Sequence, residues 1–235
     1  MKILLTGGSG RLGSMLTQMR FFDYVPTRKE MDISDYKSVD KYTKNLDIDL
    51  IVHAAAIPNT LDTQETMNSL YEVNIIGTYN LLGIAPILFI SSEYVFDGKK
   101  GMYTETDSVN PLNFYGYTKA LGENMMIKNN HNNKILRCGR MSLNPWPYKY
   151  ACDDMFTSGD YLDVMANEID IAIELYEILP HILHIGTERK SVLDLALQTN
   201  LNVKHISRNS LPNALPEDCS LDVTLWNSIK QNLLD

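Results

Sequence analysis

The 235-residue sequence has few cysteines, no excess of positive charge and no long apolar run. Its three cysteines, Cys138, Cys152 and Cys219, are odd in number and form no Cys-x-x-Cys pair. This pattern predicts neither a disulfide framework nor a zinc knuckle. No stretch approaches about 18 apolar residues, and the first ten residues lack the apolar region and cleavage site of a secretory signal. We therefore expect a cytoplasmic protein in a reducing compartment, with no membrane partner.

The charge balance excludes a further class of partner. A formal net charge of −8 leaves no basic stripe that could neutralise a nucleic-acid backbone, so we expect no nucleic-acid partner. A small anionic ligand stays compatible with this charge, because the N-terminus of a helix can bind phosphate. His181 and His184 form a His-x-x-His pattern, but on a strand their side chains face opposite sides. No metal site is therefore predicted.

Short apolar runs alternate with amphipathic segments of helical length along the first two thirds of the chain. The strands that these runs predict are 2–6, 49–56, 87–92, 134–138 and 181–186, with a weaker edge strand at 23–27, where Pro26 lacks an N–H. The helices predicted between them are 11–20, 35–45, 68–83, one that begins at 114, and 161–179. This alternation predicts an α/β fold with a doubly wound, Rossmann-like parallel sheet.

The periodicity weakens after Arg140. Residues 141–160 contain two prolines and several aromatic residues but show no period, and they predict a loop region. We expect a dinucleotide-binding Rossmann domain at 1–140, to which the strand and helix of 161–186 return. Residues 141–160 and 187–235 then form a small C-terminal substrate-binding portion.

The sequence LLTGGSGRLG places Gly7, Gly10 and Gly13 between the first predicted strand and the first predicted helix. Without side chains, a turn of this kind lets backbone N–H groups approach a pyrophosphate, and the helix dipole adds attraction. A tight turn without a ligand is the alternative. The position after the first strand of an alternating pattern favours a dinucleotide site.

The sequence PTRKEMD bears on which dinucleotide binds. Thr27, Arg28 and Lys29 stand where a site that prefers NAD usually carries a carboxylate for the ribose hydroxyls. Cations at this place can pair with a 2′-phosphate, so the sequence predicts NADP(H) in preference to NAD(H). Two solvated basic residues on a turn are the alternative.

Tyr115 and Lys119 are four residues apart at the start of a predicted helix and therefore share one face. An ammonium group near a phenol favours the phenolate, so we expect Lys119 to lower the pKa of Tyr115. Such a pair suits proton transfer to or from a reacting oxygen. Ser91 and Ser92 end a buried strand, which places their hydroxyls at the carboxyl edge of the sheet.

The motifs taken together resemble the extended short-chain dehydrogenase/reductase superfamily, and within it the dTDP-4-dehydrorhamnose reductase family. The stretches that carry the resemblance are TGGSGRLG, MDIS, VHAAA, VNIIGTYNL, FISSEYVFDG, YTETDSVNPLNFYGYTKALGE and LPEDCSLD. The resemblance implies an NADPH-dependent oxidoreductase of deoxysugar biosynthesis. Its substrate would be a nucleotide-linked 4-keto-6-deoxy sugar, and a homodimer is one option for its assembly.

The resemblance also implies roles for single residues. Tyr115 would be the proton donor, Lys119 its electrostatic partner and a contact of the cofactor ribose, and Ser92 the hydroxyl that polarises the carbonyl. Glu93 and Tyr94 would lie beside the sugar with Ser92, although Glu93 is one methylene longer than the family's Asp. To the cofactor residues already named, the resemblance adds Arg11 and Leu12 at the pyrophosphate, Asp32 and Ile33 at the adenine, and Ala54, Ala55 and Ala56 along the cofactor.

The sequence departs from this family after residue 140. Arg140 occupies a position where the family has an aromatic residue, and the region that covers the substrate is short. Trp146, Tyr148 and Tyr150 would either stack on a base or only pack. Two other functions stay open. One is an epimerase or dehydratase of a nucleotide sugar, and the other is a non-catalytic regulatory subunit that binds NADP.

Overall fold

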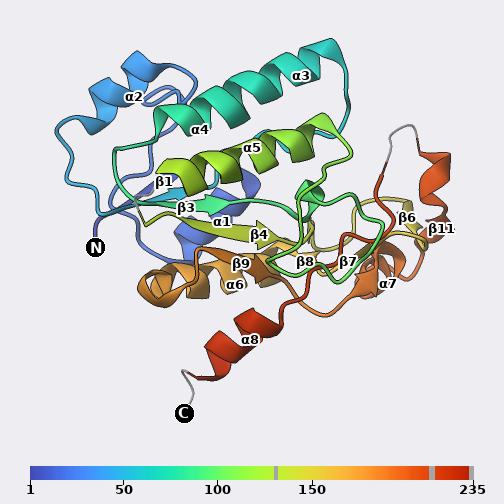
Figure 1. The fold of residues 1–235 in the computed structure, drawn as a ribbon. Coiled ribbons are helices and arrows are strands. Elements are labelled where there is room, and N and C mark those ends of the chain that lie inside the picture. Colours follow the sequence, from blue (N-terminus) through green and yellow to red (C-terminus); the bar gives the residue numbers. More distant parts are fainter. Residues whose placement is uncertain (130–131, 212–214, 233–235) are drawn as a thin grey trace.

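A parallel sheet of five strands organises the chain (Figure 1). The structure, a computed structural model, describes residues 1–129, 132–211 and 215–232. The strands lie in the order β1-β2-β3-β4-β9, and every neighbouring pair is parallel. Their bounds are Ile3–Thr6, Leu50–His53, Ile87–Ile90, Lys134–Cys138 and Ile182–Ile185. The predicted fold class is confirmed.

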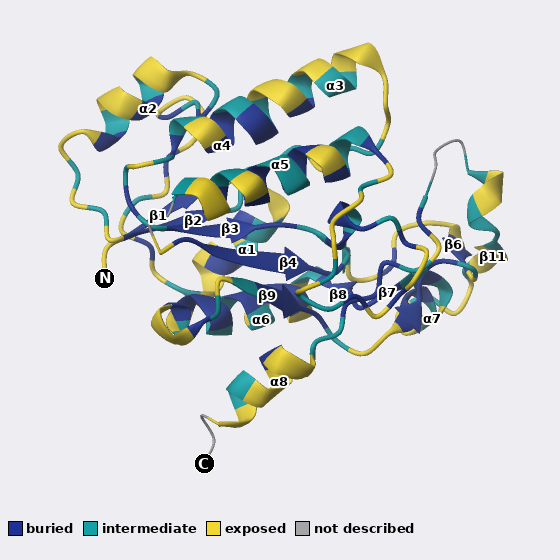
Figure 2. Ribbon diagram, in the orientation of Figure 1, coloured by how far each residue is buried: buried dark blue, intermediate teal, exposed yellow. Residues whose placement is uncertain are grey.

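Helices cover both faces of this sheet, as Figure 1 shows. One face carries α1 (Arg11–Met19) and α6 (Leu162–Glu174), which pack against each other. The other face carries α2 (Tyr36–Thr43), α3 (Gln64–Leu70), α4 (Gly77–Asn80) and α5 (Phe114–Asn129). Since strand side chains alternate between faces, Leu5 packs into one core cluster and Leu4 into the other. Figure 2 shows the strands buried and the outer helix faces exposed.

Two elements differ from the sequence prediction. Segment 23–27 makes only an isolated parallel bridge from Tyr24 to Leu4, because Pro26 has no N–H with which to extend a ladder. The predicted helix 68–83 starts earlier, at Gln64, because the Thr63 side chain accepts from the backbone N–H of Thr66 and caps it. It continues through a π-helical stretch, η1 (Tyr71–Ile76), into α4.

Residues 141–160 form short strands, so the prediction of a loop region was wrong in part. β5 (Met141–Ser142) pairs with β8 (Asp160–Tyr161), β6 (Tyr150–Cys152) with β11 (Lys204–Ile206), and β7 (Phe156–Thr157) with β10 (Lys190–Ser191). Strands of two or three residues with remote partners leave no periodicity in a sequence. The remaining helical elements are η2 (Glu93–Val95), η3 (Tyr176–Ile178), α7 (Val192–Leu197), η4 (Arg208–Ser210) and α8 (Thr224–Gln231).

The C-terminal helix α8 packs against β9, and its Trp226 is fully buried in the same core cluster as the sheet. Part of the segment 187–235 therefore lies on the Rossmann sheet, and its residues 212–214 and 233–235 lie outside the described residues. The division into a dinucleotide domain and a substrate portion stays a prediction. Over the described residues, every helix is too short or too polar to cross a bilayer.

Candidate active site

The turn between β1 and α1 is built from glycine. Gly7 has a φ of +78°, and its carbonyl oxygen accepts from the backbone N–H of Gly10 at 2.8 Å. A Cβ at Gly13 would overlap that same carbonyl oxygen, so only glycine fits this packing. No side chain caps the first turn of the nine-residue helix α1, which leaves its N–H groups available to a ligand. The turn therefore fits the pyrophosphate of a dinucleotide.

A cleft of about 790 Å³ opens at the carboxyl ends of the sheet strands, beside this turn. It brings together most of the residues that the sequence singled out. Those that line it are Gly7, Gly10, Arg11, Leu12, Gly13, Ala54, Ala56, Ser92, Glu93, Tyr94, Tyr115 and Lys119. Segments more than a hundred residues apart thus meet in one site.

The residues predicted at the adenine end lie elsewhere. Thr27 donates to the Glu30 carboxylate from its backbone N–H and its hydroxyl, both at 2.8 Å. Arg28 is 73% exposed and forms an ion pair with Asp32 at 3.0 Å. Ile33 is buried in a core cluster, and Ala55 packs against the same cluster. The residues that line the cleft include none of the five predicted cofactor contacts Thr27, Arg28, Asp32, Ile33 and Ala55. Their contact with a cofactor stays a prediction.

Close packing positions the helix that carries Tyr115 and Lys119. A Cβ at Gly116 would overlap the carbonyl oxygen of Tyr94, so glycine at this place lets α5 approach η2. The Tyr94 and Tyr115 rings meet edge to face with centroids 6.2 Å apart. Ser92, which precedes η2, therefore lies beside the first turn of α5, and the Ser92 side chain forms a hydrogen bond that acts on Tyr115.

Asn74 supports the same helix from the side. Its amide nitrogen donates to the Thr118 hydroxyl at 3.1 Å, and its carbonyl oxygen accepts from the backbone N–H of Ile57 at 2.8 Å. The side chain is 2% exposed. Asn74 thus ties the segment after β2 to α5.

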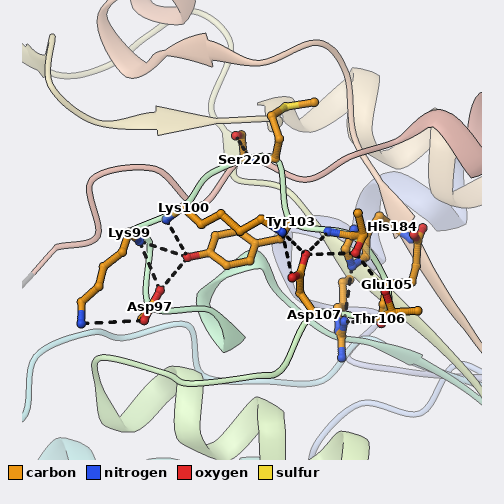
Figure 3. Close-up of polar contacts among 12 residues, drawn as sticks. Asp97, Lys99, Lys100, Tyr103, Glu105, Thr106, Asp107, His184 and Ser220 are labelled. Atoms are coloured by element: carbon orange, nitrogen blue, oxygen red, sulfur yellow. Dashed lines mark hydrogen bonds and ion pairs between the residues drawn. The ribbon is translucent and has the colours of Figure 1, made fainter.

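The loop between η2 and α5 is held rigidly, as Figure 3 shows. The Tyr103 hydroxyl donates to Asp97 at 2.6 Å and accepts from the backbone N–H groups of Lys99 and Lys100. The Lys100 ammonium reaches both oxygens of Asp107, at 2.8 and 2.6 Å. Because this loop joins the Ser92 and Tyr115 segments, its internal contacts help to fix the distance between them.

Burial controls the acidity of Tyr115. It raises the pKa of the phenol to about 12, and the hydrogen bond from Ser92 opposes the rise. The expectation that Lys119 lowers this pKa is not met in the structure. The physical reason is that desolvation of the buried phenol is the largest effect on its pKa. The Lys119 ammonium lies over the Phe89 ring, 4.1 Å from its centroid. The phenol therefore keeps its proton at neutral pH.

Lys119 is also buried, with 3% of its surface exposed. Burial lowers its pKa to about 8, while the negative charge of Glu123 acts to raise it. Glu123 lies one further turn along α5, so Tyr115, Lys119 and Glu123 form one stripe on the helix. At neutral pH most Lys119 side chains carry their charge.

Glu93 is a buried carboxyl group in the cleft, with 2% of its surface exposed. Burial raises its pKa to about 7, and the hydroxyl of Thr157, which donates to it at 2.7 Å, opposes the rise together with Arg140.

His53 is buried too, and its ring nitrogens contact the hydroxyls of Thr6 at 2.7 Å and Thr78 at 2.9 Å. The His53 ring lies 5.7 Å from the Phe89 ring and does not line the cleft.

Sequence reasoning missed the far wall of the cleft. The residues that line it are Arg140, Ser142, Tyr148, Leu211 and Leu215. Only Leu215 belongs to a stretch that carries the family resemblance, LPEDCSLD. The aromatic residues after residue 140 left packing and binding open. Across the described ranges, no three His, Cys, Asp or Glu side chains gather in a way that could hold a metal ion.

This sheet order, with a glycine turn after β1 and a Ser, Tyr and Lys set in one cleft, defines the extended short-chain dehydrogenase/reductase class. Within that class the chain belongs to the RmlD substrate binding domain family, which matches residues 1–142.

Curated relatives give two kinds of likeness. The chain is 33% identical over 147 residues to the dTDP-4-dehydrorhamnose reductase of Aggregatibacter actinomycetemcomitans, covering 58% of this chain and 50% of that protein. It is 30% identical over 154 residues to the methionine adenosyltransferase 2 subunit beta of Rattus norvegicus, covering 58% and 46%. The chain thus spans about half the length of the curated relatives it matches.

Solved structures share the fold over almost the whole chain. A dTDP-4-dehydrorhamnose reductase from Clostridium acetobutylicum superposes with a TM-score of 0.85 at 24% identity, covering 98% of this chain and 93% of that one. A dTDP-4-dehydrorhamnose reductase from Bacillus anthracis, in complex with NADP, gives a TM-score of 0.83 at 21% identity, covering 97% and 93%. At these identities the likeness shows the fold alone.

Proposed function

We propose that the protein is an NADPH-dependent reductase of a nucleotide-linked 4-keto-6-deoxy sugar. The observation that carries the proposal is the meeting of a glycine turn with Ser92, Tyr115 and Lys119 in one cleft. Membership of the RmlD family and the likeness to dTDP-4-dehydrorhamnose reductases support this reaction class. Three buried free cysteines suit the reducing, cytoplasmic compartment that we propose for it.

The side chains divide the proposed chemistry among them. Tyr115 gives its phenolic proton to the carbonyl oxygen at C4, and the Ser92 hydroxyl donates a hydrogen bond to the same oxygen as negative charge develops there. Lys119 holds the ribose of the cofactor and stabilises the phenolate that Tyr115 becomes. The cofactor, when bound, supplies a hydride. The uncapped first turn of α1 would hold its pyrophosphate, with Arg11 beside it.

The preference for NADP rests on the turn after the first βα unit. Arg28 and Lys29 provide cations there, and Arg28 forms an ion pair with Asp32. Because Arg28 is mostly exposed, its ion pair is weak and can be exchanged for a 2′-phosphate. The NADP complex of the Bacillus anthracis protein supports a dinucleotide of this type on the same fold.

The test is a panel of nucleotide-linked 4-keto-6-deoxy sugars, with NADPH oxidation followed by absorbance. We expect Tyr115→Phe to lower kcat by about 100- to 10,000-fold, since a general acid contributes that much. NADPH affinity should stay within about twofold of wild type. Tyr117→Phe is the matched control, because Tyr117 lies on the same helix but is exposed and outside the cleft. An unchanged kcat in Tyr115→Phe would refute the proposal.

The second candidate is a regulatory subunit that binds NADP without catalysis. Relatives called methionine adenosyltransferase 2 subunit beta favour it. It predicts that the protein binds NADPH but oxidises it with no member of the panel, and that Tyr115→Phe leaves its biological effect intact. An epimerase or dehydratase would instead convert a nucleotide sugar without net NADPH consumption. The same panel, analysed for products as well as absorbance, separates all three functions.

A further inference from the structure

The arginines fall into two groups by their partners. Five form ion pairs with carboxylates, namely Arg20, Arg28, Arg137, Arg189 and Arg208. Within the described part of the chain, Arg11 and Arg140 have no such partner. Both of these line the same cleft. Two unpaired guanidinium groups in one cleft indicate that two anionic groups are bound there. Arg11 stands at the glycine turn, where the cofactor pyrophosphate fits, and this leaves Arg140 for a second anion.

The backbone of Arg140 is fixed in place. Its carbonyl oxygen accepts from the N–H of Asp160 at 2.9 Å, and its N–H donates to the Thr157 hydroxyl at 3.4 Å. A Cβ at Gly159 would overlap the Arg140 backbone, so the two strands meet closely here. The fixed backbone limits the region of the cleft that the Arg140 side chain can reach, so a ligand need not order the chain that carries it.

Arg140 stands where two cavities meet. The cleft of about 790 Å³ holds Ser92, Tyr115 and Lys119. A second cavity of about 380 Å³ is lined by Trp146, Tyr150 and other residues of the C-terminal portion. Arg140 lines both cavities, together with Tyr148, Leu211 and Leu215. A long ligand that runs from the reacting centre into the aromatic cavity therefore passes this guanidinium group.

The surroundings of Arg140 keep its charge in the cavity. The guanidinium carbon lies 6.0 Å from the centroid of the Trp146 ring, a cation–π contact that leaves its N–H groups available. Burial raises the pKa values of Glu93 and Tyr94, and the positive charge of Arg140 acts to lower both of them. Burial raises the pKa of Glu93 to about 7, which weakens its ability to neutralise Arg140 at neutral pH.

Two further donors on the same segment lack acceptors. The Ser142 hydroxyl and the Trp146 indole nitrogen are buried and have no hydrogen-bond partner among the described residues. Ser142 is 7% exposed and Trp146 is 4% exposed, and each lines one of the two cavities. Buried donors without acceptors carry an uncompensated desolvation cost, which a ligand rich in oxygen acceptors would offset.

We propose that Arg140 binds the diphosphate of the nucleotide-linked substrate and so selects substrates that carry this group. A planar guanidinium fork matches phosphate oxygens in a bidentate way. The sugar would then face Tyr115 while the nucleoside extends toward the aromatic cavity. This inference rests on the proposed function, and it assigns a specificity-determining role to a position where the sequence departs from the family pattern.

The test measures ligand binding by calorimetry on the full chain. The probes are thymidine diphosphate, uridine diphosphate, thymidine and NADPH, each applied to wild type, Arg140→Gln and Arg140→Lys. We expect Arg140→Gln to bind the preferred nucleoside diphosphate about 10- to 100-fold more weakly, because it loses charged hydrogen bonds. Arg140→Lys keeps the charge without the fork and should fall between the two. Thymidine affinity should stay within about twofold, because it has no phosphate.

Arg11→Gln is the matched control, because it removes the other unpaired guanidinium of the cleft. It should weaken NADPH binding and leave the nucleoside diphosphate unaffected, whereas Arg140→Gln should do the reverse. In steady state, Arg140→Gln should raise KM for the sugar nucleotide with kcat nearly unchanged, since the diphosphate is bound equally in ground and transition states. Arg140 acts on the buried Glu93 and lies over the Trp146 ring, so the melting temperature of each variant is measured and affinities are compared between folded proteins. Arg140→Lys keeps the charge and serves as the control for folding.

The outcomes separate this inference from the proposed function. Equal diphosphate affinity in wild type and Arg140→Gln would overturn the inference, and so would weaker NADPH binding by Arg140→Gln or no diphosphate binding by wild type. Activity on the sugar panel together with any of these results leaves the reductase standing without this role for Arg140. Diphosphate binding through Arg140 without NADPH oxidation would remove the reductase and keep the anion site.

Discussion

A buried ion pair between α5 and β4 gives the sharpest quantitative prediction. Glu123 on α5 and Arg137 on β4 are 3% and 4% exposed at their side chains. Arg137 donates from Nη2 to Oε2 at 2.9 Å and from Nε to Oε1 at 3.1 Å, which is a bidentate arrangement. The Ser91 hydroxyl donates to Oε1 of Glu123 at 2.6 Å. The pair thus links α5 to the ends of β3 and β4.

The magnitude follows from the burial. Removing one member of a buried pair leaves an uncompensated charge in the core and costs about 3–5 kcal/mol. We therefore expect Glu123→Gln and Arg137→Met each to lower the free energy of unfolding by about that amount. The double variant leaves no unpaired charge, so its loss should fall short of the sum of the single losses by about 2 kcal/mol or more.

The assay is urea unfolding of the four proteins, analysed as a double-mutant cycle. The variant Lys2→Met is a control, since its ion pair with Asp47 is exposed and should change stability by less than about 1 kcal/mol. Additive losses for Glu123→Gln and Arg137→Met would refute the reasoning, because they would mean that the two charges do not compensate each other.

The same pair affects function through Lys119. Burial lowers the pKa of Lys119 to about 8, and Glu123 opposes this fall. If charged Lys119 is the active form, kcat/KM of wild type falls as pH rises through about 8. In Glu123→Gln the pKa of Lys119 drops further, so the decline should begin at lower pH. A pH profile that is unchanged in this variant would show that Lys119 does not feel the Glu123 charge.

Two further predictions concern stability at low pH and the cofactor turn. Burial lowers the pKa of His53 from 6.5 to about 3, so this residue favours the folded state above pH 6.5 and loses that contribution as pH falls toward 3. At about pH 5 the loss is about 2 kcal/mol. His53→Gln, although less stable overall, should lack this part of the pH dependence, whereas a variant of the exposed His205 should keep it. Equal dependence of the unfolding free energy on pH in wild type and His53→Gln, measured by urea unfolding, would contradict this. Gly13→Ala forces a Cβ onto the Gly7 carbonyl, so NADPH should bind at least about 10-fold more weakly by fluorescence titration. Gly83→Ala strains a glycine with a φ of +82° that does not line the cleft, so it should leave the affinity unchanged. Unchanged binding in folded Gly13→Ala would show that the turn is not the site.

The sheet and the first half of the cleft could be predicted from sequence because their signals are local. Apolar runs such as Ile87–Ile90 are strands whose neighbours in the sheet follow from the alternating βα pattern. The glycines of the first turn and the spacing of Tyr115 and Lys119 are likewise local features. The sheet topology then brings these residues to one edge of the sheet. Motifs that are separate in the sequence therefore predict side chains that lie together in the fold.

The far wall of the cleft could not be predicted, because it depends on contacts between remote segments. Trp146 packs against Ala151 and Val192 in a separate small core, which no period in the sequence indicates. Acidity was predicted with the wrong sign at Tyr115, since spacing places an ammonium one turn away but does not reveal how deeply a phenol is buried. Desolvation depends on the whole surrounding structure and is therefore the property least visible in a sequence.

Burial of the phenol also bears on the direction of the proposed reaction. Reduction of a carbonyl needs a protonated donor, and a Tyr115 pKa of about 12 keeps the proton in place across the physiological range. Oxidation of the alcohol would need the phenolate, which the same burial disfavours. Once Tyr115 has given up its proton, Lys119 is the nearest cation on α5 that can compensate the negative charge of the phenolate. Its pKa of about 8 lies close to neutral pH. At neutral pH the site therefore holds the protonation states from which carbonyl reduction starts, a neutral phenol beside a charged ammonium.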